Sequence, residues 1–406
     1  MSPRYIKVTV ILIVVAALFL AAFLLTKTNN VHRHIDTAGK IIYLSDADSA
    51  GLPHVWLVSR DGTGAKDLTP GKQTCADPAF SPDGSQIAYI SDSDGQAQIY
   101  VMDADGQNPQ KVTFGSASKE SPSFSQDGKM LAYLSQGTLT ALNLETRQPE
   151  LLLPPPSVGS SGASTAATMM PGETPSDFLK RRLLGSPVVK FSWAPNANAN
   201  ATGSHELSIA AVQNLEDENI QSLTILPTLD AQANVVPLAP TVTIAWAPDA
   251  SRIYTAVIGV KAGPQEQLFS GILQFSPSGA SINTAPLAFA KTDTFGPFNP
   301  AISPDGKRAL FLVLSSPDIA HQQIVGLFGE PVDGSSPPRM AAKGSVSNVQ
   351  WEPDGSHVIL LGAPPHSTRH DLWVLSVGGS DPPLDLTKGS GDVTSAQWSP
   401  SLAKTN

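Results

Sequence analysis

Short apolar runs separated by polar turns recur along most of this chain, and their side chains alternate between apolar and polar. Examples are QIAYIS from Gln86, MLAYLS from Met130 and RALFLVL from Arg308. A period of two is typical of β-strands, and these runs are too short for most helices. The pattern therefore predicts an all-β protein made of many short strands.

A five-residue motif, an apolar residue followed by Ser/Ala-Pro-Asp-Gly or a variant, sets the period of these strands. Its copies are FSPDG from Phe80, FSQDG from Phe124, WAPNA from Trp193, WAPDA from Trp246, ISPDG from Ile302, WEPDG from Trp351 and WSPSL from Trp398, at spacings of 44, 69, 53, 56, 49 and 47 residues. Pro presets φ, Asp bonds the backbone two residues on, and Gly accepts positive φ, so the motif predicts a tight turn. We call it the anchor turn and expect its large first residue to point into the core between units. Such a period indicates a propeller, in which each unit is one four-stranded blade.

The two ends of the repeat region complete each other. The first unit, from Gly39, has its second, third and fourth strands but no first, whereas DVTSAQWSP from Asp392 supplies a first strand with no unit behind it. Six full units and this composite predict a seven-bladed β-propeller over residues 39–400, in which the C-terminal strand 393–400 closes blade 1. Residues 401–406 form a tail.

The longest spacing contains an insert, residues 154–187, which is rich in Pro, Ser, Gly and Ala up to Pro175. This composition predicts disorder. Its last part, SDFLKRRLL, favours a short amphipathic helix capped by Ser176. Two interpretations of that part stay open, a docking peptide and a solvated stub of helix.

An uncharged stretch of 18 residues, VTVILIVVAALFLAAFLL from Val8, precedes the repeats. It covers most of a bilayer's hydrocarbon core, no Ala-x-Ala cleavage site follows it, and no cysteine lies near it for a lipid anchor. We therefore expect a short cytoplasmic N-terminus (residues 1–7), a transmembrane signal anchor (residues 8–25) and a stalk (residues 26–38). The propeller would lie on the extracytoplasmic side of the cell membrane. The alternative is a cleaved signal peptide and a secreted protein.

Charge narrows the classes of partner. The formal net charge is −9, and because the first 40 residues carry five basic residues and one acidic residue, the remainder carries −13. An acidic globular part argues against nucleic acid and against docking on anionic lipid. The single cysteine, Cys75, excludes an intrachain disulfide, and since no basic partner is visible we expect it to be buried and unreactive.

The best unit resembles the TolB-like family of propeller repeats, which are related in shape to WD repeats. From Pro78 to Thr113 it reads PAFSPDGSQIAYISDSDGQAQIYVMDADGQNPQKVT, with the SPDG turn, an IAY strand, two DG turns, an IYVMD strand and a final VT. The resemblance covers residues 39–400 and is weaker in blades 4 and 5. It implies a fold but no specific function. TolB itself carries an α/β domain ahead of a six-bladed propeller, for which the 13 residues between Leu25 and Gly39 leave no room, so a Tol–Pal role is not expected.

Motifs of catalysis and of cofactor or metal binding are missing from the sequence. It contains no nucleophile elbow, Walker loop or dinucleotide-binding glycine motif. The aspartate clusters SDADSAG, SDSDGQ and MDADGQ lack the Glu that a calcium loop needs at its twelfth position, so they predict turns. Two weak histidine pairs remain: His32 with His34 beside the apolar stretch, and His366 with His370 and Asp371 in one loop. A solvated loop explains both better than a metal site does.

These observations favour a binding or scaffold protein of the cell envelope, with no catalytic, cofactor or metal residues. The partner would be another envelope protein or an extracytoplasmic ligand. Two alternatives stay open: a propeller enzyme of hydrolase or lyase type with its active site at the channel mouth, and the ectodomain of a sensory or transport assembly. Carboxylates or histidines that converge in the channel would favour the enzyme.

Overall fold

A computed structural model describes the propeller but not the two ends of the chain. The described residues are 39–47, 51–153, 169, 172–195, 207–215, 220–229, 233–238, 241–262, 267–282, 296–314, 324–363, 367–378 and 381–400. The expected signal anchor, the stalk and the C-terminal tail lie outside them. Within these ranges no helix has the length and apolar character needed to span a bilayer.

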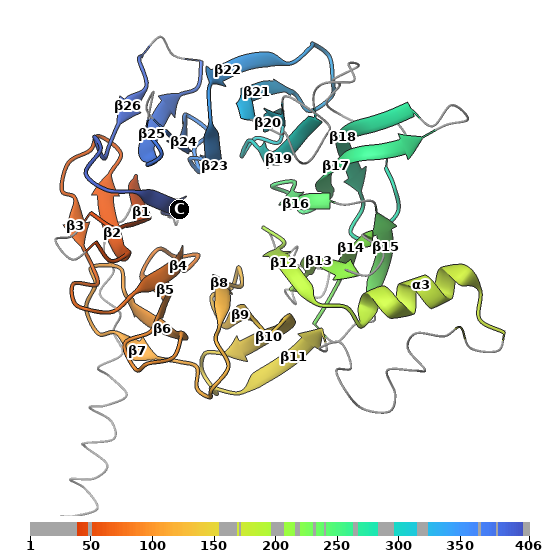
Figure 1. Cartoon of the computed structure of the whole chain (residues 1–406), viewed down its shortest axis with the longest axis horizontal. Helices are drawn as coiled ribbons and strands as arrows, with labels where there is room; N and C mark the ends of the chain where they lie inside the picture. The colour runs from red at the N-terminus through yellow and green to blue at the C-terminus, as the bar shows by residue number, and fades with distance from the viewer. Residues whose placement is uncertain are drawn as a thin grey trace, which may run out of the picture. The chain divides into compact units, whose positions relative to one another are not determined.

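Seven antiparallel sheets are the seven blades of a propeller and surround a central axis (Figure 1). The strands of each blade are given from the innermost described strand outward. Blades 1 to 3 contain β27 (Val393–Trp398), β1 (Lys40–Ser45), β2 (His54–Ser59) and β3 (Lys66–Asp67); β4 (Cys75–Phe80), β5 (Gln86–Ser91), β6 (Gln98–Asp103) and β7 (Gln110–Lys111); and β8 (Glu120–Phe124), β9 (Met130–Ser135), β10 (Thr138–Asn143) and β11 (Pro149–Leu153). Blades 4 to 7 contain β12 (Val188–Trp193), β13 (Ile209–Leu215), β14 (Ile220–Leu226) and β15 (Asn234–Leu238); β16 (Thr241–Trp246), β17 (Ile253–Ala262) and β18 (Gln267–Phe275); β19 (Gly296–Ile302), β20 (Arg308–Leu314), β21 (Ile324–Pro331) and β22 (Arg339–Lys343); and β23 (Val346–Trp351), β24 (His357–Gly362), β25 (Asp371–Ser376) and β26 (Leu384–Asp385). The predicted all-β, seven-bladed propeller is confirmed. The expected fourth strand of blade 5 lies outside the described residues.

Blade 1 is built from both ends of the repeat region, as predicted. β27 pairs antiparallel with β1, and the register runs from Ile41 opposite Trp398 to Ser45 opposite Val393. Ring closure therefore depends on ordinary backbone hydrogen bonds between segments more than 340 positions apart in the sequence, and β27 covers the inner edge of β1 that would otherwise be unpaired.

The hydrophobic core lies between the blades, because each strand presents alternate side chains to its two neighbours. Ala88 and Ile90 of blade 2 pack with Leu131 and Tyr133 of blade 3. Five of the anchor residues are buried, as expected: Phe80, Phe124, Trp193, Trp246 and Trp398. A blade alone would leave both of these apolar faces in water, so the ring stabilises each blade through its neighbours.

The anchor tryptophans also join the blades by hydrogen bonds. In each case the indole Nε1–H donates to the carbonyl of the residue just before the anchor residue of the preceding blade. The four bonds are Trp193 to Ser123 (3.1 Å), Trp246 to Ser192 (3.3 Å), Trp351 to Ala301 (3.0 Å) and Trp398 to Gln350 (3.3 Å). A buried indole needs such a partner, and here the partner sits on the next blade.

A threonine after the short outer strand fastens the third strand of blades 1, 2 and 7. Thr69, Thr113 and Thr387 each accept a hydrogen bond from a backbone N–H near the start of that strand, at 3.0, 2.8 and 3.0 Å. Thr113 Oγ1 also donates to Gln98, and Thr387 Oγ1 donates to Asp371. The last residue of the motifs KDLT, KVT and LDLT is thus a buried threonine whose hydroxyl holds the third strand by a hydrogen bond.

The insert is only partly as predicted. Residues 154–168 lie outside the described part of the chain, but disorder up to residue 187 is wrong, because α3 (Pro175–Leu184) contacts β13, β14 and β15 and buries Leu183 completely. The predicted cap at Ser176 is also wrong. Thr174 caps the helix by accepting a hydrogen bond from the Asp177 N–H (3.2 Å), since Pro175 is favoured at the first helical position.

One buried acid has no compensating group in the described part of the fold. Glu330, near the end of β21, is 5% exposed, and its Oε1 atom finds no hydrogen-bond partner there. Burial disfavours the charged form and raises the pKa of this carboxyl to about 7. The folded protein therefore holds Glu330 protonated in a range where the unfolded chain would ionise it.

Stability should consequently fall as the pH rises from about 4.5 through 7, because the folded state binds the proton more tightly than the unfolded state. We expect Glu330→Gln to stabilise the protein at pH 8 by about 1–3 kcal/mol and to have a smaller effect at pH 5. Urea unfolding at the two pH values measures this, with Glu145→Gln at an exposed position as the control. An equal effect at both pH values would contradict the account.

Candidate functional site

The anchor turn of blade 7 departs from the repeat in the residue after the anchor. In blades 2, 3 and 6 that residue is a serine. The Ser81 hydroxyl, for example, donates to Asp83 Oδ1 (2.6 Å) and accepts from the Gln86 N–H (2.9 Å), and Ser125 and Ser303 repeat both bonds. In blade 7 a carboxylate, Glu352, takes the place of the hydroxyl.

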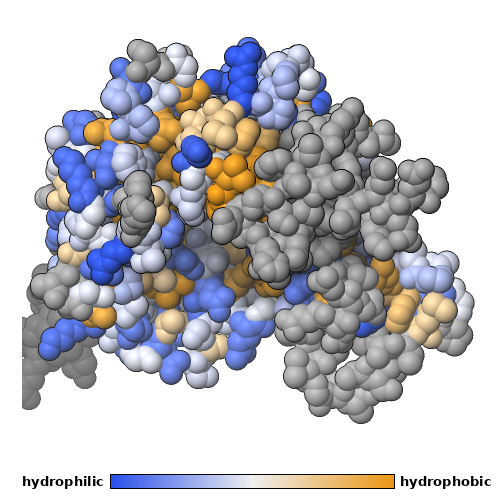
Figure 2. Space-filling view, turned by 45° about the horizontal axis from the view of Figure 1, so that its top comes forward, coloured by the Kyte–Doolittle hydropathy of each residue, from blue (hydrophilic) through white to orange (hydrophobic). Residues whose placement is uncertain are grey.

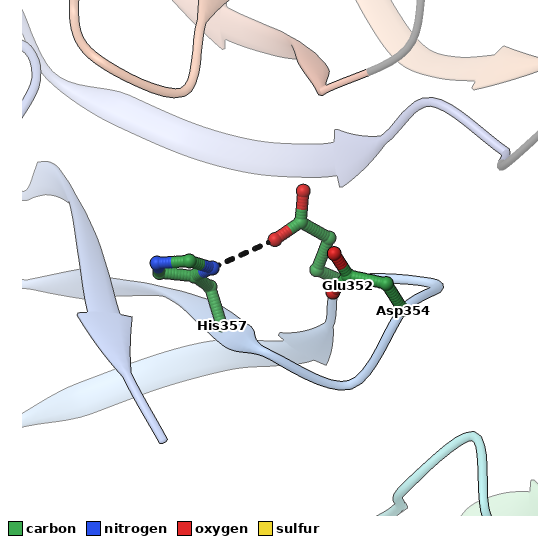
Figure 3. Close-up of side chains that lie close together, drawn as sticks. All are labelled: Glu352, Asp354 and His357. Atoms are coloured by element: carbon green, nitrogen blue, oxygen red, sulfur yellow. Dashed lines mark hydrogen bonds and ion pairs between the residues drawn. The ribbon is translucent and has the colours of Figure 1, made fainter. Parts of the chain in front are cut away.

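Glu352 is held by groups from two blades. Its side chain is 7% exposed, and Nη1 of Arg60 lies 2.9 and 3.0 Å from its two oxygens. His357 Nδ1 lies 2.9 Å from Oε2, and the Ser356 hydroxyl donates to the same atom at 3.1 Å. Figure 3 shows the imidazole of His357 directed at the Glu352 carboxylate, with Asp354 on the same turn. Arg60 follows β2 of blade 1, so this ion pair crosses the junction between blades 7 and 1.

Arg60 is the matching departure on the other side of the junction. Its backbone N–H bonds to the carbonyl of Gly39, just before the second strand of the blade, and the same bond defines the equivalent position elsewhere. The equivalent residues are Ala104, Leu144, Val332 and Val377. Arg60 therefore stands at a position that is apolar in blades 2, 3, 6 and 7, and Glu352 stands at an anchor-turn position that is small in the other blades. The pair gives one blade junction a charge-assisted bond in place of apolar contact.

Glu352, Asp354 and His357 are also the described residues that could hold a metal ion, since one ligand atom of each lies within 4.8 Å of the others. A cavity of about 410 Å³ opens beside them, lined further by Arg60, Asp61 and other groups. However, the guanidinium already supplies the positive charge at both Glu352 oxygens. A cation would have to displace Arg60, so the donor set fits an ion pair better than a metal.

The end of the channel at the anchor turns forms a second cavity, of about 350 Å³. Blades 1, 2, 3, 4 and 7 contribute to its wall. Its polar side chains are Ser81, Ser123, Gln126, Ser192, Gln350 and Gln397. None of the described residues that line it carries a charge. We call this cavity the channel pocket.

Several groups of the innermost strands are already engaged between blades. Gln397 Oε1 accepts from the Phe80 N–H (2.9 Å), and Gln350 Nε2 donates to the Ala396 carbonyl (3.0 Å). Asp77, farther along the channel, accepts from the Ser121 N–H of the next blade (2.9 Å). These bonds fix the channel wall. Within the described wall, the side chains of Ser123, Ser192 and Gln126 form no hydrogen bond across a blade junction, so they could meet a ligand.

The residues singled out in the sequence that the structure describes, Cys75, His370 and Asp371, do not form one site. Cys75 is buried, as expected; burial raises the pKa of its thiol to about 11, and its Sγ donates to Thr69. His370 Nδ1 lies 3.5 Å from Asp392, whereas the Asp371 carboxylate accepts from Thr387 Oγ1 and from the Gly389 N–H. His366, His32 and His34 lie outside the described residues.

The aspartate clusters SDSDGQ and MDADGQ form turns, as predicted, whereas SDADSAG lies partly outside the described residues. The N–H of Gly95 bonds to the carbonyl of Asp92 and that of Gly106 to Asp103, and both glycines have positive φ. Sequence reasoning missed the Arg60–Glu352 pair. Glu in the serine position of WEPDG was a visible signal, but Arg60 could be found only once the blades were placed side by side.

Comparisons with known proteins agree with this fold. The family model of the TolB β-propeller domain matches residues 38–161, and the repeats are TolB-like. No curated protein matches the chain. Among solved structures, oligogalacturonate lyase from Vibrio parahaemolyticus is 13% identical (TM-score 0.55, covering 86% of each chain), and an oligogalacturonate lyase in complex with manganese is 15% identical (TM-score 0.53, covering 84% of this chain and 83% of that one). TolB from Acinetobacter baumannii is 15% identical (TM-score 0.49, covering 90% of this chain and 68% of that one). At such identities the likeness shows the fold alone.

The paired departure at the junction of blades 7 and 1 can be tested by restoring the repeat. Arg60→Leu should destabilise the protein by about 1–3 kcal/mol, because it leaves the buried Glu352 carboxylate without its cation. Glu352→Ser should cost less, since Arg60 is 44% exposed and can turn to water. The double variant should recover most of the loss.

Urea unfolding of the four proteins gives the coupling energy. Additive effects of the two substitutions would show that the pair does not act as a unit. A manganese-dependent rise in melting temperature that needs His357 would instead support a metal site.

Proposed function

We propose that this protein is a binding module that holds a ligand at its channel pocket and performs no chemistry of its own. The observation that supports this most is the uncharged wall of the pocket, built by the innermost strands of five described blades. General acid–base chemistry needs titratable groups that converge on one point. Hydroxyl and amide groups instead suit recognition through hydrogen bonds.

The chemistry of the wall favours a neutral polar ligand. Serine and glutamine side chains can both donate and accept, which matches the alternating N–H and C=O groups of a peptide. The pocket opens at the anchor turns, so a loop or chain end of a protein partner can approach along the axis. We therefore propose a protein partner, inserted by an uncharged segment.

The setting that we propose is the cell envelope. It rests on the uncharged stretch from Val8, which is long enough to anchor the propeller on the extracytoplasmic side of a membrane. An acidic propeller tethered in this way would be held near the bilayer without adhering to anionic lipid.

A lyase activity is the second candidate, because two solved structures with this fold are oligogalacturonate lyases and one is in complex with manganese. The cluster of Glu352, Asp354 and His357 is the feature that favours it. Arg60 weighs against it, since that side chain occupies the carboxylate that a metal would need.

Blocking the mouth of the channel pocket should abolish partner binding. Gln126 lies on an anchor turn, is exposed and lines the pocket, whereas Lys129 is exposed on the same turn and does not line it. We expect tagged full-length protein, extracted from its own membranes in mild detergent, to capture a partner that Gln126→Trp loses and Lys129→Trp retains. Quantitative mass spectrometry measures the capture, and unchanged melting temperatures confirm folding. Identical capture by both variants would refute the channel pocket as the binding site.

A further inference from the structure

Each innermost strand carries a polar residue one layer below the channel pocket. The pocket wall contains residues that directly precede an anchor residue, such as Ser123, Ser192 and Gln397. The residue two positions earlier lies about 7 Å farther along the channel, because a strand rises by ~3.3 Å per residue. It is polar in all seven blades, and we call these seven residues the inner ring: Asp77, Ser121, Lys190, Thr243, Asn299, Asn348 and Ser395.

A β-bulge lies at this layer in every innermost strand. The register between the first and second strands of each blade shifts at or beside the inner-ring residue. Four of these residues also have φ between 46° and 51°, namely Asp77, Ser121, Asn299 and Asn348. Bulges re-aim side chains and are common beside functional sites. The repeated bulge therefore places seven polar groups at one level around the channel.

Apolar surface of the propeller gathers elsewhere. Figure 2 shows it over the blades that lie at the top of Figure 1. A groove of about 320 Å³ lies there between blades 6 and 7, with Val346, Leu360 and Trp373 in its wall. The inner ring contains no residue of this kind, so a ligand that reaches it must be polar.

Lys190 is the basic residue of the inner ring, and no carboxylate in the described part of the chain forms an ion pair with it. It lies on β12, which β13 and the two neighbouring blades cover on its other sides, so its exposed surface faces the channel (Figure 1). The surrounding protein removes part of the water around the ammonium, which lowers the pKa of Lys190. A charge in this position is stabilised by an anion beside it.

The inner-ring residues on either side of Lys190 carry hydroxyl groups, Ser121 in blade 3 and Thr243 in blade 5. Thr243 is 3% exposed, and its Oγ1 finds no hydrogen-bond partner among the described residues. The same holds for Ser395 Oγ in blade 1. The acid of the ring, Asp77 in blade 2, already accepts a hydrogen bond from the Ser121 N–H (2.9 Å). An ammonium and two hydroxyls can all donate to one carboxylate.

We propose that the segment held in the channel pocket is the C-terminus of a partner protein, and that Lys190, Ser121 and Thr243 bind its terminal carboxylate. The inference rests on the proposed function and names the group that ends the inserted segment. An uncharged wall, followed about 7 Å deeper by a lone cation, fits a chain whose charge lies at its end. A side-chain carboxylate would instead require the partner's chain to turn back within the channel.

The probe for the test is a pool of short N-acetylated peptides of Gly, Ala, Ser, Asn and Gln, made either with a free C-terminal carboxylate or with a C-terminal amide. Full-length protein in mild detergent is treated with limiting succinimidyl acetate, and mass spectrometry measures the acetylation of individual lysines. At about 10 mM, the acid pool should slow acetylation of Lys190 about threefold or more and leave the exposed Lys129 and Lys307 unchanged. The amide pool and acetate at the same concentration should protect none of them.

The inference is overturned if the acid pool does not protect Lys190, or if the amide pool protects it equally, because the terminal charge would then have no role. Equal protection by acetate would also overturn it, since the ring would then bind a free carboxylate with no need of a chain end.

Substitution of Lys190 separates this inference from the proposed function. We expect Lys190→Met to lose the partner that the full-length protein captures, as Gln126→Trp does, and Lys129→Met to retain it. Lys190→Met should melt at or above the temperature of the unchanged protein, because it removes a charge that has no partner in the described fold. Capture that Gln126→Trp loses and Lys190→Met retains would refute the terminal carboxylate and leave the channel pocket as the binding site.

Discussion

The pairing of β27 with β1 is the interaction on which the rest of this structure depends. It joins segments from opposite ends of the repeat region and completes blade 1. Each blade buries its faces only against its neighbours, so a gap at one blade would expose apolar surface on two others. The channel pocket depends on the same closure, because Gln397 belongs to β27 and bonds to the Phe80 N–H in blade 2.

Different chemistry joins different blades around the same ring. Four junctions use an anchor tryptophan whose indole reaches the preceding blade. The junction of blades 7 and 1 adds the Arg60–Glu352 pair to one of these bonds. At this junction the charges of Arg60 and Glu352 hold two blades together, whereas the wall of the neighbouring channel pocket is uncharged. This division is the one that we expect of a protein that recognises a ligand, because the Glu352 carboxylate is already paired with Arg60.

Much of the fold follows from the sequence, since the anchor turns and the alternation of apolar residues are local signals. The seven blades and the composite blade 1 could be predicted from them. The start of α3 could not, because Thr174 and Ser176 are both good caps and Pro175 decides between them. Its packing depends on the tertiary contact of Leu183. The role of Arg60 has no local signature, because it depends on the Glu352 carboxylate that the neighbouring blade brings beside it.

The most direct test of the account is deletion of residues 393–406, which removes β27 and leaves every other described strand intact. If closure holds the ring together, the truncated protein should lose the cooperative unfolding transition of the full chain or aggregate, and the backbone amides of β1 should exchange freely with solvent. Differential scanning calorimetry together with hydrogen exchange gives both readouts. A truncated protein with the melting curve and β1 protection of the full chain would contradict the account.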